Sequence, residues 1–255
     1  MWRRFVHPSH TVTDRMQNLP RWLMHLNLSG SRNFGASLLL VLSALIACNS
    51  VFAGEPETQE NTKFVVDFKQ QSASSEVRHI ADWVMDSRDN MGMPFVIIDK
   101  VNAKVFVFDA RGQMLGADAA LLGMGRGDLS SADIGGRKMS GIRPQDRNTP
   151  AGRFLVVLDH DIHGKEILLI DYAASIALHP IVKGTPAENR AQRMQTETAQ
   201  DNRISYGCIN VPVKFYEKII SPVFTRKNGF VYILPETSKA SELFETSGGG
   251  SNSSK

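Results

Sequence analysis

The chain has 255 residues, of which 42% are hydrophobic and 22% are charged, and its formal net charge is +3. That balance is typical of an ordinary globular protein, and the length suits one domain with appendages. Residues 1–53 hold five arginines and one aspartate, so residues 54–255 carry 24 basic and 25 acidic side chains. With no basic stripe in that larger part, the sequence argues against nucleic-acid binding.

Residues 1–53 fit an export signal. A basic stretch precedes the apolar run Ala36–Ala47, which is too short to span a membrane comfortably and suits the core of a signal peptide. Cleavage after Ala53 would remove the segment. Alternatively, Leu45-Ile46-Ala47-Cys48 looks like a lipobox, which would leave Cys48 acylated as an outer-membrane lipid anchor. An uncleaved anchor is the third route, and each route predicts a protein of the periplasm or cell envelope.

Residues 54–93 are expected to form a polar spacer followed by one amphipathic helix. Apolar side chains recur there at the i, i+3, i+4 and i+7 spacing of a helix: Val77, Ile80, Ala81 and Val84. This pattern predicts a packing helix over residues 75–89, with Ser74 or Ser75 capping its start.

From residue 94 the pattern changes to β-branched and aromatic runs separated by turn residues, which is typical of strands. Strands are expected at 95–99, 104–108, 115–124, 152–159, 166–171, 174–179 and 230–234. Residues 180–204 are expected to be a loop and 213–223 an apolar helix. Many short strands with few helices predict a mainly β, sandwich-like or barrel-like fold for residues 94–236. Residues 237–255 end in a Gly/Ser-rich run and are expected to be a disordered tail.

Cys208 is the strongest candidate for chemistry. The sequence holds only two cysteines, and once Cys48 is removed or acylated, one thiol remains in a compartment where structural cysteines usually pair. Gly207 lets the backbone turn sharply before Cys208 and present N–H groups to a developing oxyanion. The alternative is a buried cysteine that packs as a small apolar residue.

A reactive thiol needs a neighbouring base, and His179 is the best candidate. It ends an apolar strand, and Pro180 prevents that strand from continuing in the middle of a sheet. His79 lies on the packing helix, while His160 and His163 lie in a polar hairpin turn without a further ligand cluster, so no metal site is expected. Activation by His179 would lower the pKa of the Cys208 thiol below its usual value of about 8.5.

Taken in order, these elements resemble the catalytic domain of the L,D-transpeptidase (YkuD-type) family over residues 94–235. The hairpin at 95–108 resembles the family's first two strands. Thr149-Pro150-Ala151-Gly152-Arg153-Phe154 resembles its Thr-Pro-x-Gly-x-Phe element. A strand ending at His179 follows, and then Ser205-Tyr206-Gly207-Cys208-Ile209-Asn210. The resemblance implies a β-sandwich-like catalytic domain.

The resemblance also implies a role for each matching residue. Cys208 would be the nucleophile and His179 its base and proton donor. The remaining positions would shape the site or its oxyanion hole: Pro180, whose carbonyl can orient the imidazole, Ser205, Tyr206, Gly207 and Asn210. The implied reaction is attack on a peptidoglycan stem tetrapeptide, release of D-Ala, and transfer of the thioester to an amine, without a metal or organic cofactor. Carbapenems would be expected inhibitors.

Two other functions stay open. Water could resolve the same thioester, which would make the chain a peptidoglycan hydrolase (a carboxypeptidase or endopeptidase). A non-catalytic wall-binding module is the second. A papain-like protease is not favoured, because every histidine precedes Cys208. The polar segment Glu188–Arg203, longer than the family's usual spacing, is expected to form a lid or a partner-binding loop.

Overall fold

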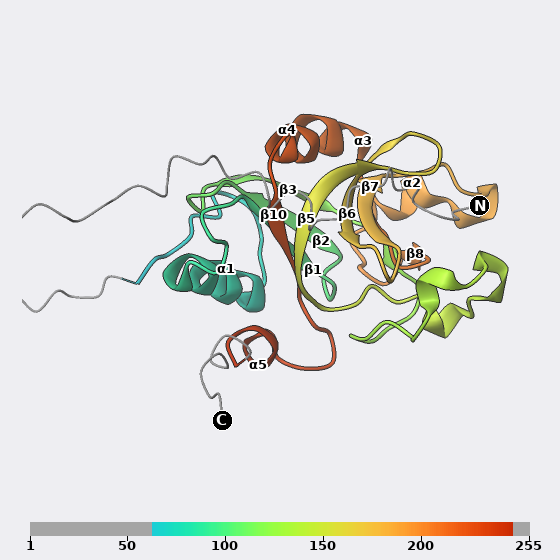
Figure 1. Cartoon of the computed structure of the whole chain (residues 1–255), viewed down its shortest axis with the longest axis horizontal. Coiled ribbons are helices and arrows are strands. Elements are labelled where there is room, and N and C mark those ends of the chain that lie inside the picture. Colours follow the sequence, from blue (N-terminus) through green and yellow to red (C-terminus); the bar gives the residue numbers. More distant parts are fainter. Residues whose placement is uncertain (1–62, 247–255) are drawn as a thin grey trace, which may run out of the picture. The chain divides into compact units, whose positions relative to one another are not determined.

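Eight strands form one sheet in the computed structural model, which describes residues 63–246 (Figure 1). Their order across the sheet is β3-β2-β1-β10-β5-β6-β7-β9. The bounds are β1 (Phe95–Asp99), β2 (Lys104–Phe108), β3 (Met114–Ala119), β5 (Gly152–His160), β6 (Glu166–Asp171), β7 (Ile176–Pro180), β9 (Ile209–Val211) and β10 (Gly229–Ile233). The predicted mainly β fold class is confirmed. The export segment, its Cys48 and residues 54–62 of the spacer lie outside the described residues.

The two edges of this sheet meet, which makes it nearly a barrel. Just beyond β3, Leu121 donates its N–H to the carbonyl of Asn210 in β9 at 2.8 Å and accepts the Asn210 N–H at 2.9 Å. The next residues form β4 (Leu122–Gly123), which pairs in parallel with β8 (Arg203–Ser205). The strand predicted over 115–124 is therefore wrong as one element, because Leu121 leaves the first pairing to join the opposite edge.

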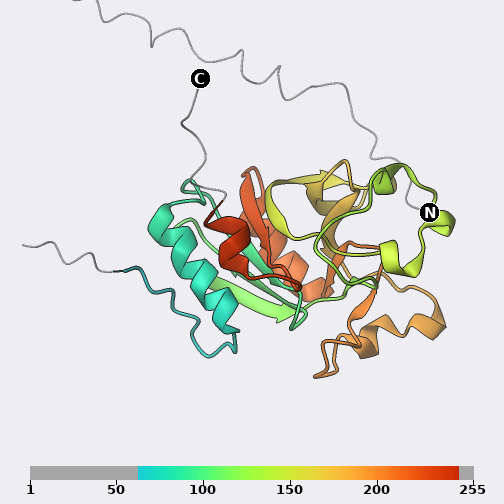
Figure 2. The same cartoon turned by 90° about the horizontal axis from the view of Figure 1, so that it is seen from below.

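The central strands are buried on both faces. Along β1, Val96 and Ile98 contribute to one hydrophobic core, and Phe95 and Ile97 to the other. Helices cover both faces, which is why these strands are apolar at every position instead of alternating. One face carries α1 (Ser75–Ser87) and α5 (Ala240–Phe244), and the other carries α3 (Val213–Phe215), the π-helical turn η7 (Tyr216–Ile220) and α4 (Ser221–Phe224). Figures 1 and 2 show α1 and α5 side by side.

Helix α1 confirms the predicted packing helix. The hydroxyl of Ser74 accepts the N–H of Val77 at 3.3 Å and caps the first turn. The four apolar residues predicted from the helical spacing are all buried. The helix ends at Ser87, two residues before the predicted end, because Arg88 takes up a left-handed backbone conformation.

The expected disordered tail is wrong for residues 237–246. Helix α5 lies there and buries Ala240 and Phe244. The ring of Phe244 lies 6.4 Å from that of Trp83 on α1 and 5.7 Å from that of Tyr232 on β10, measured between centroids. Apolar burial against α1 and the sheet therefore orders a segment whose composition resembles that of a tail. Residues 247–255 lie outside the described residues.

Two long connections flank the end of the sheet that holds β7 and β9. Between β4 and β5 lie three short 3₁₀ helices, η3 (Ile134–Gly136), η4 (Met139–Gly141) and η5 (Pro144–Asp146). The predicted loop 180–204 contains η6 (Pro186–Glu188), the short helix α2 (Arg190–Arg193) and the start of β8. Figure 2 shows both connections at the same end of the sheet. Within residues 63–246, no helix is long and apolar enough to cross a membrane.

Candidate active site

Cys208 lies at the end of a tight turn between β8 and β9. The hydroxyl of Ser205 donates to the carbonyl of Cys208 at 2.6 Å and accepts the N–H of Gly207 at 3.1 Å, so one side chain closes the turn. Gly207 has a φ of +131°, a conformation that side chains disfavour. A Cβ there would also lie 2.8 Å from Ile176 Cδ1 and 2.9 Å from the carbonyl of Asn148. The turn therefore requires the glycine.

Thr149 fixes the position of this turn through two hydrogen bonds. Its buried hydroxyl donates to the carbonyl of Gly207 at 2.8 Å and accepts the N–H of Gly123 at 2.9 Å. One side chain thus ties the turn before Cys208 to strand β4. The Thr-Pro element that resembles the family motif has a structural role at its first residue, because this hydroxyl fixes the backbone next to the thiol.

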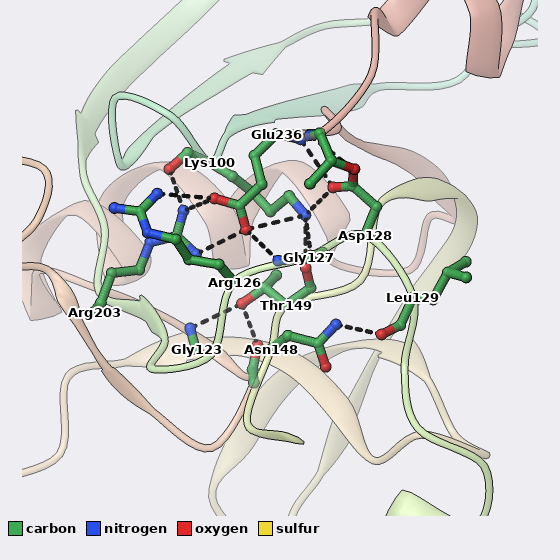
Figure 3. A network of polar contacts seen from close by, with 12 residues as sticks. Lys100, Gly123, Arg126, Gly127, Asp128, Leu129, Asn148, Thr149, Arg203 and Glu236 are labelled. Carbon is green, nitrogen blue, oxygen red and sulfur yellow. Dashed lines mark hydrogen bonds and ion pairs between the residues drawn. The ribbon is translucent and has the colours of Figure 1, made fainter. Parts of the chain in front are cut away.

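A buried charged network supports Thr149 in turn (Figure 3). Lys100 is fully buried, and its Nζ donates to the Thr149 carbonyl at 2.9 Å and to Asp128 Oδ1 at 2.6 Å. Glu236 accepts from Arg203 Nη2 at 2.6 Å and lies 3.9 Å from Lys100 Nζ. Burial acts to raise the pKa of Asp128, but hydrogen bonds from Lys100 and Thr237 outweigh it and hold that pKa at about 2. Each of the two buried cations thus pairs with a carboxylate, Lys100 with Asp128 and Arg203 with Glu236.

His179 sits opposite Asn210 on the neighbouring parallel strand, and its side chain is buried. Its Nδ1 lies 2.8 Å from the carbonyl of Pro180. A carbonyl can only accept, so Nδ1 carries the proton and Nε2 holds the lone pair. The carbonyl of Pro180 therefore orients the ring, and the role of His179 as a base stays a prediction.

Asn210 links the imidazole to the nucleophile turn. Its Nδ2 lies 3.4 Å from His179 Nε2 and 3.5 Å from the carbonyl of Cys208. Its Oδ1 accepts from Nη1 of Arg190 at 3.1 Å. Asn210 is almost fully buried, so these contacts form in a place from which water is largely excluded.

A single cavity of ≈130 Å³ brings these groups together. Cys208, His179, Asn210 and Arg190 all line it. The rest of its wall is mainly apolar and comes from the connection that holds the 3₁₀ helices, the β5–β6 turn, β7 with its flanking residues, and the turn before Cys208: Ile134, Gly135, Arg137, Met139, Ile142, Ile162, Ala174, Ser175, Ala177, Val182, Ser205 and Tyr206. Cys208 as a whole residue is intermediate in exposure, and it lines this cavity.

The electrostatics contradict the expected low thiol pKa. Burial raises the pKa of the Cys208 thiol, and the backbone of Ala177 and the charge of Arg190 offset this only in part. Burial likewise lowers the pKa of His179, although the Pro180 carbonyl acts in the opposite direction. The sulfur lies 3.5 Å from the carbonyl of Ser175, to which it can donate. Both directions favour the neutral thiol and the neutral imidazole at neutral pH.

Two of the N–H groups expected to form the oxyanion hole already have partners within the turn. Because Ser205 accepts the N–H of Gly207, that group is engaged within the turn. The N–H of Cys208 interacts with the sulfur of the same residue, which acts to lower the pKa of the thiol. Tyr206 contributes a cavity wall, and its ring lies under the guanidinium of Arg147, 3.9 Å from the centroid. An oxyanion would therefore need the N–H of Tyr206, or a shift of the turn when substrate binds.

Sequence reasoning missed three residues of the site and its support: Arg190, Thr149 as a hydrogen-bonding residue, and Lys100. Arg190 lies in a polar segment without periodicity, so only the fold places it in the cavity. The other histidines are elsewhere. His79 lies on α1, 2.5 Å from Glu245, whereas His160 ends strand β5 and only His163 of the two lies in the β5–β6 turn predicted for both. No metal-binding group of three or more His, Cys, Asp or Glu residues occurs within residues 63–246.

Comparisons with known proteins give weak similarities. Neither the models of known families nor the curated sequences match this chain. Among solved structures, the helical cell shape determining protein Pgp2 from Campylobacter jejuni has a TM-score of 0.38 and 16% identity, covering 58% of this chain and 49% of its own. The catalytic domain of an L,D-transpeptidase from E. faecium has a TM-score of 0.30 and 15% identity, covering 56% of this chain and 98% of its own. The chain thus spans about half the length of Pgp2. Values this low do not assign it to a family.

Proposed function

We propose that this chain is an exported cysteine acyltransferase that cross-links peptidoglycan stem peptides, or attaches protein to them, as an L,D-transpeptidase. The observation that carries the proposal is that Cys208, in the turn before β9, and His179, on the adjacent parallel strand β7, line one cavity, with Asn210 contacting the imidazole and the Cys208 carbonyl. Residues 94–236 would be the catalytic domain. Residues 1–53 would deliver it to the periplasm, either by cleavage or with Cys48 as a lipid anchor.

In the first half-reaction, Nε2 of His179 removes the proton from the Cys208 thiol as sulfur attacks the stem peptide's carbonyl carbon. The carbonyl π bond opens to a tetrahedral oxyanion. As the oxyanion collapses, the C–N bond to the terminal residue breaks, and the imidazolium gives its proton to the departing amine. The products are D-Ala and a thioester on Cys208. A buried neutral base and a buried neutral thiol suit this order of proton transfer.

In the second half-reaction, the amine of another stem attacks the thioester. His179 removes a proton from that amine and returns it to sulfur as the C–S bond breaks, which regenerates the thiol. The mainly apolar wall of the cavity favours an amine over water, because it limits the access of water to the thioester.

Purified protein incubated with tetrapeptide-stem muropeptides tests this function. We expect a cross-linked dimer and free D-Ala, both absent with Cys208→Ala and formed on the order of 10²–10⁴ times more slowly with His179→Ala. A shortened monomer without any dimer would show that the enzyme hydrolyses stem peptides and does not cross-link them. Unaltered muropeptides with the wild type would refute the enzyme assignment.

A further inference from the structure

The cavity that holds Cys208 has an unbalanced charge. Two arginines, Arg190 and Arg137, line it, and no aspartate or glutamate does. Arg190 is also buried, whereas the Arg137 side chain is 39% exposed and its guanidinium contacts Asp146 and a backbone carbonyl outside the cavity. Glu188, which does not line the cavity, pairs with the Arg190 guanidinium at 2.8 Å, and among the described residues no carboxylate pairs with it from within the cavity.

The polar segment after β7 holds Arg190 in place. Glu188 accepts from Nε of Arg190 at 2.8 Å, and Thr185 forms a capping box with Glu188. Arg193, on the next turn, donates to the carbonyls of Glu188 and Asp201 at 2.8 Å and 2.9 Å. These hydrogen bonds fix the conformation of the segment and hold Arg190 at the cavity wall, while its expected role as a lid or a partner-binding loop stays a prediction.

Two of the five N–H donors of Arg190 are used within the protein. Nε binds Glu188, and Nη1 binds Asn210. The guanidinium fork matches a carboxylate in geometry, with two parallel hydrogen bonds. Arg190 and Cys208 line the same cavity, so an anion held by Arg190 would lie in the cavity that contains the thiol.

We propose that Arg190 forms a carboxylate subsite that binds the free terminal carboxylate of the residue released from the acyl donor. This inference rests on the proposed function and adds a substrate requirement to it. In a donor peptide, that carboxylate is bonded to the α-carbon next to the departing nitrogen. An anchor beside Cys208 would therefore set the scissile carbonyl against sulfur. The enzyme would select donors that end in a free carboxylate.

Binding to Cys208→Ala tests the subsite without turnover. Two probes are used, a stem tetrapeptide with a free C-terminal carboxylate and the same peptide as its C-terminal amide, each titrated by calorimetry. We expect the acid to bind on the order of 10–100 times more tightly than the amide, since a bidentate charged pair is lost. Adding Arg190→Gln should remove this preference. Lys183→Gln is the matched control, because it removes an exposed cation from the same segment outside the cavity and should keep the preference.

Equal binding of acid and amide to Cys208→Ala would overturn the subsite, and this comparison does not depend on the Arg190 variant folding. A preference that survives Arg190→Gln would overturn the role of Arg190. Turnover by the wild type separates the two proposals. If it converts the acid but binds both peptides equally, only the subsite falls. If the wild type neither binds nor converts either peptide, both the proposed function and the subsite are refuted.

Discussion

At the scale of single residues, burial determines how the thiol and the imidazole can work. Water stabilises the charged forms of both groups, so removing it raises the pKa of Cys208 and lowers that of His179. In the proposed reaction the pair would therefore start neutral and transfer its proton only as the sulfur attacks. This differs from the thiolate that the sequence suggested, because a motif names the two groups but does not report how deeply the fold buries them.

A pH profile of kcat/KM tests this neutral pair. His179 acts as a base only when unprotonated, and its lowered pKa means that protonation sets in below the usual value of about 6.5. The acid limb of the profile should therefore have its midpoint below about pH 6.5. Alkylation of Cys208 by iodoacetamide should still be rising with pH above about 8.5, because the thiolate forms late.

An acid limb at pH 6.5 or higher would contradict the burial argument for His179. For Cys208, the contrary result is an alkylation rate that has already reached its plateau at pH 7. Cys208→Ala shows how much labelling arises elsewhere in the chain.

At the scale of elements, the site is assembled by connections that the sequence pattern does not reveal. Strands β6 and β10 fall within one residue of their predicted bounds, since apolar runs mark them clearly. Strands β8 and β9 were not predicted, because each has only three residues and is defined by its partner across the sheet. The position of Arg190 has the same origin: its contact with Asn210 joins residues that only the tertiary fold brings together.

The hydroxyl of Thr149 joins two such connections, and Thr149→Val tests its importance. Valine keeps the shape but leaves the Gly123 N–H and the Gly207 carbonyl without their shared partner. We expect the free energy of unfolding to fall by about 1–3 kcal/mol per unsatisfied group, measured by urea denaturation. Activity should fall further than stability alone explains, because the turn before Cys208 loses its support.

Thr225→Val provides the matched control. Thr225 is exposed, and its hydroxyl donates to the backbone carbonyl of Ser221 in the preceding helix. The free energy of unfolding of this variant should therefore differ from that of the wild type by no more than about 0.5 kcal/mol. If Thr149→Val were as stable and as active as this control, the hydroxyl could not be holding the turn.

At the scale of the whole described unit, two hydrophobic cores on opposite faces stabilise one sheet. The apolar strands and α1 are predictable from the sequence because each of these elements carries its own pattern of apolar residues. Helix α5 is not, because its five residues become a helix only by packing on Trp83 and Tyr232. Composition alone therefore assigns Ala240–Phe244 to a tail, although this segment closes one of the two cores.

Phe244→Ala measures this closing contact. Its ring is buried against α1 and β10, so removing it should lower the free energy of unfolding by about 3 kcal/mol in urea denaturation. Leu129→Ala is the control, because Leu129 is 85% exposed and should change stability little. A Phe244 variant as stable as this control would mean that α5 contributes nothing to the core and that the tail interpretation was right.

The central claim is that the thiol of Cys208 forms an acyl-enzyme in the cavity that it shares with His179. Intact mass spectrometry after incubation with a carbapenem tests it most directly, since a β-lactam of this class acylates a thiol that attacks carbonyls and leaves a stable adduct. Wild-type protein should gain the mass of one carbapenem, and Cys208→Ala should gain none. An unmodified wild type, or an equal adduct on Cys208→Ala, would contradict the account.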